Sequence, residues 1–504
     1  WEFDALAPAS VDASRGERGL VGLGIRVLEF FGVSVEEKAA RKLGEWFEGR
    51  TLAGGKAGLH ALDFDGGFAL EAIADGTTLP ASAEPTLIFL HGTASSTEGS
   101  FGKLWAADNG AARDARARLA TAYRGRSFAY EHRSLTESPI ANALALVRRL
   151  PEGARLHLVS HSRGGLVGEL LCLGQCEGVE QLLDKALVRE LFAADRTIAA
   201  QLGLLPLSPD ELAERDAGYA SDRDQLVALV AELVARDIRV TRFVRVACPA
   251  RGTTLASGRL DRWLSMLNFL AGKALGGGLF GDTLEFLLAV VKERTDPRTL
   301  PGLEAMMPGS ALTRLLHHPA LVTAADLSVI AGDIEGDSPW QKIKLLVTDW
   351  FYGADHDLVV NTGAMSGGLR RPDGGARFRV DRGAQVNHFS YFHNPDSIGW
   401  LVAGLTRRDD DAGGFMPIAE APHTPPRGRQ AVERSRQATG PRPLAVVLPG
   451  TMGSSLSAAG QPVWLHYLTL LRGGLGKIAI GKADVQPEQL IDDFYGPLVD
   501  FLAN

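Results

Sequence analysis

The sequence contains few cysteines: three in 504 residues, at Cys172, Cys176 and Cys248. An odd and low number of thiols cannot form a disulfide framework, and their spacing matches no zinc-binding pattern with nearby histidines. Neither cross-links nor a structural metal is therefore expected to hold the fold together. So few cysteines are also typical of a reducing compartment, and we expect a cytoplasmic protein.

An excess of basic residues is missing too, because the net charge is −7 and the isoelectric point is about 6.0. Proteins that bind nucleic acid need clustered positive charge, so no nucleic-acid partner is expected. The sequence also lacks a GxGxxG motif and a P-loop in a strand-to-helix setting. No nucleotide, flavin or metal cofactor is therefore expected.

A long uninterrupted apolar run is absent as well. The most apolar region, 264–291, contains Lys273, Asp282 and Glu285, which argues against a transmembrane segment and favours an apolar cap over a pocket. The first residue is Trp1, and no signal-peptide pattern follows it. We expect the chain to be part of a longer polypeptide.

Short apolar runs that are typical of buried strands alternate with helical patterns from residue 85 onward. They lie at 86–90, 127–130, 155–160, 240–247, 327–332 and 344–348. Strands separated by helices predict an α/β fold, with a mostly parallel sheet that helices cover on both faces.

The composition divides the chain into four parts. Residues 1–80 predict an N-terminal subdomain of helix and strand that packs on the following domain, and residues 81–406 predict the α/β domain itself. Within that domain, the charged helical stretch at about 177–239 and the apolar stretch at about 255–325 are expected to be insertions above the sheet. Residues 407–443 are rich in proline and charge, which indicates a flexible linker, and residues 444–504 begin a further module.

One short segment carries the strongest chemical signal. In RLHLVSHSRGGLVGELLCLG, residues 155–174, Ser162 lies between a strand pattern and a helix pattern, with Ser160 and Gly164 two residues on either side. Small residues at these positions are what a sharp strand-to-helix turn requires, and the pattern resembles the nucleophile elbow of α/β hydrolases. Serine replaces the usual first glycine. The alternative is a serine in an ordinary glycine-rich turn.

Other segments extend this resemblance. TLIFLHGTASSTEGSFG (86–102) places a His-Gly pair after a buried strand, and VRVACPARGTTLAS (244–257) resembles the lipase segment that leads into a lid. WFYGADHDLVVNTGAMSGG (350–368) resembles the lipase turn that carries the catalytic acid, and 377–405 contains a strand, a histidine-bearing loop and a closing helix. Residues 85–406 therefore resemble a lipase-like α/β hydrolase, a serine hydrolase family.

The resemblance implies a role for each matching residue. Ser162 is the expected nucleophile, and the backbone N–H groups of Thr93 and Arg163 are expected to form the oxyanion hole. His91, in the His-Gly pair, is expected to be structural.

The acid and the base follow the nucleophile along the chain in this family. Asp357 matches the position before the Val-Val pair and is the expected acid, with Asp355 as the alternative. His388, thirty-one residues later, is the expected base. His393 is the alternative base, although it could instead lie at the N-terminus of the closing helix.

A second resemblance covers the end of the chain. VVLPGTMGSSL (446–456), followed by VWLHYLTLL and GGLGKIAI, is similar to the start of hydrolases related to lecithin–cholesterol acyltransferase. No second elbow follows, so 444–504 is expected to be a truncated start. Any nucleophile of that module, with further domains of the same polypeptide, would lie beyond Asn504.

Three functions remain open at this point. The leading one is a lipase- or esterase-like enzyme that hydrolyses a small-molecule or lipid ester through an acyl-enzyme. An amidase, a peptidase or an acyltransferase would use the same triad. The third is a catalytically idle hydrolase fold that serves as a recognition or regulatory module of a larger polypeptide.

Overall fold

The computed structural model describes thirteen stretches of the chain. They are 44–46, 48–183, 185–192, 209–250, 300–306, 310–333, 367–372, 375–382, 391–409, 411–417, 454–458, 461–462 and 485–490. By contacts between residues, the chain divides into two compact units: 1–336 with 356–418, and 337–355 with 419–504. In the second unit, the described residues form a three-stranded sheet of order β13-β12-β14, with β12 Ser454–Ala458, β13 Gln461–Pro462 and β14 Val485–Leu490.

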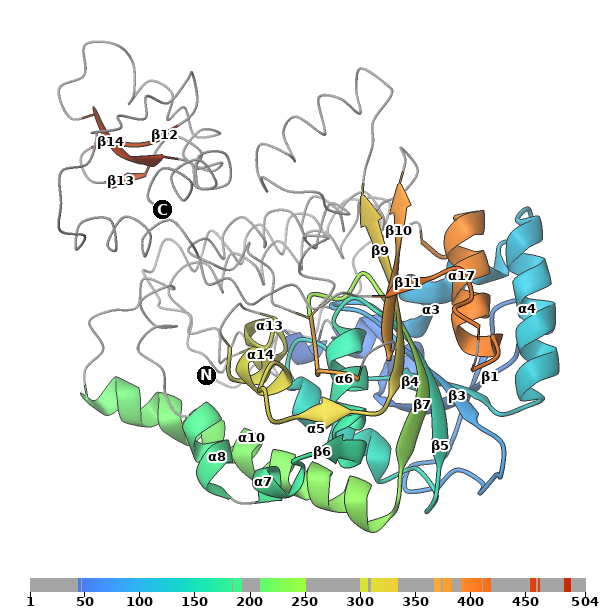
Figure 1. The fold of residues 1–504 in the computed structure, drawn as a ribbon, viewed down its shortest axis with the longest axis horizontal. Helices are drawn as coiled ribbons and strands as arrows, with labels where there is room; N and C mark the ends of the chain where they lie inside the picture. Colours follow the sequence, from blue (N-terminus) through green and yellow to red (C-terminus); the bar gives the residue numbers. More distant parts are fainter. Residues whose placement is uncertain are drawn as a thin grey trace, which may run out of the picture. The chain divides into compact units, whose positions relative to one another are not determined.

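The first unit is built on a nine-stranded sheet of order β11-β10-β9-β7-β5-β3-β4-β1-β2 (Figure 1). Its strands are β1 Gly58–Leu62, β2 Leu70–Ala72, β3 Thr86–Leu90, β4 Ser127–Glu131, β5 Arg155–His161, β7 Arg239–Val246, β9 Asp326–Asp333, β10 Ala376–Arg382 and β11 Met416–Pro417. The six strands from β4 to β10 in this order pair in parallel, whereas β1, β2 and β11 are antiparallel.

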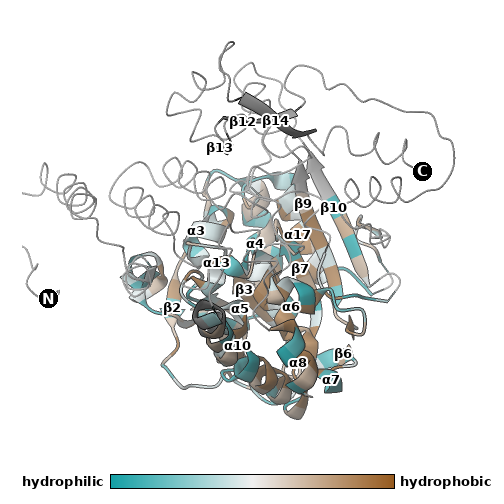
Figure 2. Cartoon of the chain, turned by 90° about the vertical axis from the view of Figure 1, so that its left-hand side faces the viewer, coloured by the Kyte–Doolittle hydropathy of each residue, from teal (hydrophilic) through white to brown (hydrophobic). Residues whose placement is uncertain are grey.

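Helices cover both faces of the sheet. Helices α4 (Gly110–Tyr123) and α17 (Pro395–Thr406) pack together on one face, and α5 (Pro139–Val147), α6 (Gly164–Leu171) and α10 (Pro209–Ala235) lie on the other (Figure 1). All five residues of β3 are buried, and the hydropathy colouring is brown along much of the central strands (Figure 2). Continuous apolar strands between two helical layers are the arrangement of the α/β-hydrolase fold, so the predicted fold class is confirmed.

Three described strands outside residues 81–406 pair within the main sheet. Strands β1 and β2 belong to the main sheet, because β1 pairs with β4, so this part of the expected N-terminal subdomain is continuous with the α/β domain. Strand β11 lies within the expected linker but pairs with β10. Two residues are too few to show a strand period, so the sequence gives no sign of this pairing. The strand expected at 344–348 lies outside the described residues.

The two insertions are described only in part. The first contains α7 (Glu180–Leu183), α8 (Lys185–Leu191) and the whole of α10, which packs against α5. The second contains α13 (Pro301–Glu304) and α14 (Ala311–Leu316). Two strands of a small separate sheet, β6 (Cys176–Glu177) and β8 (Val322–Thr323), pair with each other. Both insertions therefore contribute helices to the described structure.

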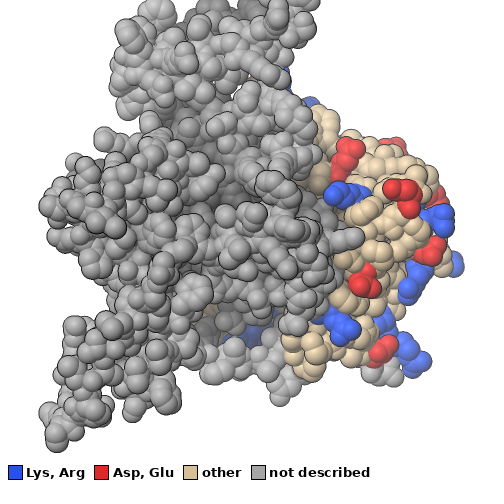
Figure 3. Space-filling model, turned by 90° about the horizontal axis from the view of Figure 1, so that it is seen from above, with Lys and Arg blue, Asp and Glu red and all other residues tan. Residues whose placement is uncertain are grey.

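Positive and negative side chains are mixed on the described part of one face of the molecule. On the face shown in Figure 3, lysines and arginines alternate with aspartates and glutamates, and neither sign forms a continuous patch. Among the described helices, none combines the length and apolarity needed to cross a bilayer.

Backbone strain gathers at the carboxyl ends of three adjacent strands. Ala94 follows β3, Ser162 follows β5 and Ala247 follows β7, and their φ angles are 49°, 51° and 52°. The left-handed region is costly for residues with a Cβ atom, and such positions gather where a surrounding structure holds them for a purpose. The three strained residues mark this edge of the sheet as the place to search for a site.

The strain at Ser162 predicts an unusual order of stabilities. Glycine adopts φ 51° freely whereas alanine does not, so the Ser162→Gly protein should unfold with a free energy about 1 kcal/mol higher than that of Ser162→Ala. Urea denaturation of both variants measures the difference. Ser160 is the matched control because it lies within β5, where glycine should be the less stable substitution. A Ser162→Gly variant less stable than Ser162→Ala would contradict the strain argument.

Burial also makes one histidine of β5 a source of pH dependence. Burial lowers the pKa of His157 to about 3, and its Nδ1 lies 2.6 Å from the Tyr123 hydroxyl. The unfolded chain, with a pKa near 6.5, takes up this proton first as the pH falls. Stability from this group is therefore complete above pH 6.5 and is lost toward pH 3.

Replacing His157 should remove this dependence. Between pH 7.5 and 5.0 the parent should lose about 2 kcal/mol of unfolding free energy through this residue alone, and His157→Gln should lose that much less over the same interval. Urea denaturation at the two pH values gives both losses. Equal losses in the two proteins would show that His157 accepts its proton equally well in the folded state.

Candidate functional site

Ser162 occupies the turn between β5 and α6, as the sequence predicts. Its N–H donates to the Val246 carbonyl at 2.9 Å, and its carbonyl accepts from the N–H of Gly165 at 3.0 Å. The residue is 5% exposed, and no described residue hydrogen-bonds to its hydroxyl. The backbone is thus fixed on both sides of a serine hydroxyl that the described residues leave uncommitted.

The turn after β3 lies directly against this serine. A Cβ atom built on Gly92 would stand 3.1 Å from Ser162 Cβ, and one built on Gly164 would stand 2.3 Å from the Leu90 carbonyl oxygen. The second distance is shorter than any real contact of a Cβ atom, so only glycine fits at the start of α6. These glycines let the turn after β3 and the elbow touch backbone to backbone.

Thr93 and Arg163 therefore lie on two segments that meet at Ser162. Neither backbone N–H donates to any residue that the structure describes. Arg163 is completely buried and Thr93 is half-buried. Buried backbone N–H groups in folded proteins are nearly always paired, so the unengaged N–H of Arg163 in particular is available for an acceptor. Two N–H donors that reach the same oxygen can stabilise negative charge that develops on it.

His91 fixes the orientation of the peptide that carries the Thr93 N–H. Its Nδ1 lies 2.9 Å from the Gly92 carbonyl oxygen, and its Nε2 accepts from the backbone N–H of His132 at 3.0 Å. Because Nε2 accepts in the second contact, the ring is neutral and its proton is on Nδ1. Burial also favours the neutral ring, because it lowers the pKa of His91. Because C=O and N–H point in opposite directions across a trans peptide, holding the Gly92 carbonyl aims the Thr93 N–H the other way. The structural role expected for His91 is thus accounted for.

The side chain of Arg163 makes contacts that the sequence does not reveal. It is 0% exposed, and its guanidinium donates to the Gly302 carbonyl, the Glu137 carbonyl and Asn142 Oδ1. Burial lowers its pKa to about 10, which leaves it charged at neutral pH. No periodic pattern could have predicted these contacts, because the partners are 21 to 139 residues distant in sequence.

A buried carboxyl group, that of Glu48, accepts hydrogen bonds from the loop between β4 and α5. Glu48 accepts from the Leu135 N–H at 2.6 Å and from the Thr136 hydroxyl at 2.5 Å. Burial raises the pKa of Glu48, while both hydrogen bonds and the positive charge of Arg163 act to lower it. In the same loop, Ser134 Oγ accepts from the N–H of the strained Ala94 at 2.8 Å. The loop thereby supports the turn after β3.

The structure places the expected acid and base only in part. Asp357, Asp355 and His388 lie outside the described residues. His393 is described: it is exposed and directly precedes Asn394, whose side chain caps α17. Its carbonyl accepts from Asn109 Nδ2 at 2.7 Å. Its position agrees with the alternative in which this histidine lies at the N-terminus of the closing helix.

A buried ion cluster connects α6 to the segment that follows the expected acid in sequence. Glu169 pairs with Arg245 and with Arg371, the latter at 3.2 Å, and all three side chains are almost completely buried. Glu169 also accepts from the Leu369 N–H at 3.2 Å, and Arg245 donates to the Gly367 carbonyl at 2.5 Å. Residues 367–371 are thus held against the helix that begins at the elbow.

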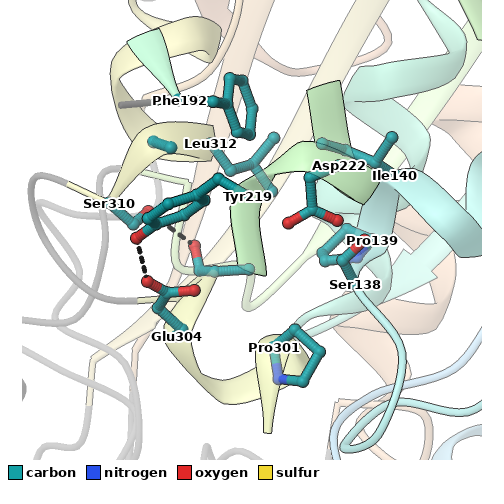
Figure 4. A pocket seen from close by; sticks show the side chains of 12 residues that line it. Ser138, Pro139, Ile140, Phe192, Tyr219, Asp222, Pro301, Glu304, Ser310 and Leu312 are labelled. Atoms are coloured by element: carbon teal, nitrogen blue, oxygen red, sulfur yellow. Dashed lines mark hydrogen bonds between the residues drawn. The ribbon is translucent and has the colours of Figure 1, made fainter. Parts of the chain in front are cut away.

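Other candidate sites in the described residues are weaker. No group of three or more His, Cys, Asp or Glu side chains among them could hold a metal ion. One pocket lies between the ends of α5 and α8 and helices α10, α13 and α14, where Tyr219 donates to Glu304 (Figure 4). Its cavity of about 20 Å³ has room for about one water molecule, which is far too small for an ester substrate.

Comparison with solved structures gives matches at low similarity. Lipase 1 from Pelosinus fermentans is 14% identical, with a TM-score of 0.36, and the match covers 64% of this chain and 99% of that one. EstA from Clostridium botulinum is 13% identical, with a TM-score of 0.35 over 65% and 88% of the two chains. The Staphylococcus hyicus lipase is 13% identical, with a TM-score of 0.31 over 63% and 92%.

Comparison of the sequence with curated proteins finds no match. A family described as "Domain of unknown function (DUF7379)" matches residues 62–194 and 223–406. These two ranges contain β3, β4, β5, β7, β9 and β10, and therefore the whole parallel part of the sheet with the elbow. Because the match spans well over half of the sequence, the chain belongs to the DUF7379 family.

Proposed function

We propose that the chain is a serine hydrolase that cleaves an acyl ester. The observation that supports this most directly is the pairing of a strained, uncommitted Ser162 with two unengaged N–H groups, from Thr93 and Arg163, on the segments that meet at it. Strain at one serine could be accidental. Acyl transfer requires a nucleophile that a base activates and donors for the oxyanion, and the surroundings of Ser162 offer an uncommitted hydroxyl with two N–H groups on adjoining segments.

In the proposed reaction, Ser162 Oγ attacks the ester carbonyl carbon while His388 takes the hydroxyl proton. The carbonyl oxygen becomes an oxyanion that accepts from the N–H groups of Thr93 and Arg163. The carbon–oxygen bond to the alcohol then breaks, and His388 returns the proton to the departing alkoxide. Asp357 orients the imidazole and stabilises its charged form.

Water completes the cycle by the same steps. His388 takes a proton from a water molecule, whose oxygen attacks the acyl carbon of the acyl-enzyme. The second oxyanion occupies the same two N–H donors, and its collapse releases the carboxylic acid and returns the proton to Ser162. Transfer of the acyl group to an alcohol, or cleavage of an amide, would use the same residues and differs only in the attacking or leaving group.

Labelling with a fluorescent alkyl fluorophosphonate tests this proposal without knowledge of the substrate. The parent should be labelled, Ser162→Ala should not react, and His388→Ala and Asp357→Asn should react slower by about 10⁴-fold or more, because each group acts through the nucleophile. The rates are read from gel fluorescence against time.

The alternative residues supply the matched controls. Asp355→Asn and His393→Ala remove the same chemical groups from neighbouring positions and should be labelled at the parent rate. Loss of labelling in His393→Ala with normal labelling in His388→Ala would reassign the base. A folded parent that stays unlabelled would instead support the idle recognition module.

A further inference from the structure

The Arg163 guanidinium joins the elbow to two other segments, the start of α13 and the start of α5. Its Nε donates to the Gly302 carbonyl at 3.1 Å and its Nη2 to the Glu137 carbonyl at 2.7 Å, and both terminal nitrogens reach Asn142 Oδ1 at 3.1 Å. All of these acceptors are neutral oxygens. A planar fork with donors in fixed directions can serve them together, whereas a lysine could not.

Two of the joined segments are also in direct contact with each other. The N–H of Gly302 donates to the Leu135 carbonyl at 3.1 Å. A Cβ atom on Gly302 would lie only 2.0 Å from the Ser134 carbonyl oxygen, so α13 begins in full contact with the loop before α5. The guanidinium holds both sides of this contact, through Gly302 on one and Glu137 on the other.

Each segment then contacts the turn that carries the Thr93 N–H. Ser134 accepts from the Ala94 N–H at 2.8 Å, and Met306, which follows α13, lies with its sulfur 3.4 Å from the Thr93 hydroxyl. Ala94 has a φ of 49°, so this turn keeps its shape only while its neighbours hold it. Contacts thus connect the Arg163 side chain to two groups of this turn, the Thr93 hydroxyl and the Ala94 N–H.

We propose that the Arg163 guanidinium is a positioning residue of the oxyanion hole: its backbone N–H is one donor, and its side chain holds the turn that bears the other. This inference rests on the proposed function and adds to it a role for a side chain that does not touch the substrate. One residue thereby contributes to the placement of both donors. Without the guanidinium, the turn keeps the hold of His91 on the Gly92 carbonyl but loses the support that reaches it through Ser134 and Met306.

The expected kinetic effect of losing the guanidinium follows from the state of the reaction that the oxyanion hole binds. Oxyanion donors bind the tetrahedral transition state more strongly than the planar ester, so a displaced donor lowers kcat and leaves KM nearly unchanged. Removal of an entire donor costs about 10²- to 10³-fold in kcat, so a displaced one should cost roughly 10- to 100-fold. Replacement of a purely structural arginine would alter the free energy of unfolding and leave kcat unchanged.

The test compares the full chain with Arg163→Met and Arg163→Lys. Methionine fills similar buried volume without a charge, and lysine keeps the charge without the fork. The readouts are kcat and KM for a short p-nitrophenyl ester and the inhibition constant of an aryl trifluoromethyl ketone, which forms a tetrahedral adduct with an active serine. Both variants should lose kcat roughly 10- to 100-fold, and the ketone should bind weaker by the same factor.

Arg155→Met is the control, because Arg155 lies at the opposite end of β5 and pairs with Asp237 at the surface.

Met306→Leu provides a second test if the arginine variants fail to fold. It keeps the volume but removes the sulfur contact with the Thr93 hydroxyl, and it should produce a smaller change in the same direction. Parent-like kcat and ketone affinity in the folded Arg163 variants, or in Met306→Leu where those do not fold, would overturn the inference while the parent remains active. An inactive parent that fluorophosphonate does not label would instead remove the proposed function, and the inference with it.

Discussion

The contact between the elbow and the turn after β3 is the constraint on which the site depends. Gly164 must lie so close to the Leu90 carbonyl that no side chain fits, and a Cβ atom on Gly92 would make a tight contact of 3.1 Å with Ser162 Cβ. The sheet makes this contact possible because β3 and β5 are parallel neighbours, so their carboxyl ends emerge side by side. Strain at Ser162 and Ala94 accompanies this close approach, and the well-packed strands below stabilise it.

Buried charges supply the rest of the order at this edge. The connections here are irregular, so they cannot satisfy their backbone groups through a ladder, and carboxylates and guanidiniums do so instead. Glu48 serves the loop before α5, Arg163 connects that loop to α13, and Glu169 fixes residues 367–371 through Arg245 and Arg371. Buried ion pairs contribute little net stability compared with apolar packing, but the loss of one partner is costly because the other charge is then buried without compensation.

The sequence predicts the regular part of this protein well. Strands with continuous apolar runs, such as Thr86–Leu90, lie where expected, and the elbow and the closing helix from Pro395 begin at the predicted residues. Each of these has a local signal in its periodicity, small residues or caps. The guanidinium contacts of Arg163, the carboxylate of Glu48 and the pairing of β11 have none, because each depends on partners distant in sequence. The roles of Asp357 and His388 remain predictions from their order along the chain.

Detection of the acyl-enzyme would test the central claim most directly. The parent is mixed with excess p-nitrophenyl butyrate, the early release of p-nitrophenol is followed by stopped flow, and acid-quenched protein is digested for peptide mass spectrometry. A serine hydrolase should show a rapid burst matching the enzyme concentration wherever acylation outpaces deacylation, with the butyryl group on the peptide that contains Ser162. Butyrylation of a different residue, or a burst with no acyl group on the peptide that contains Ser162, would contradict the account.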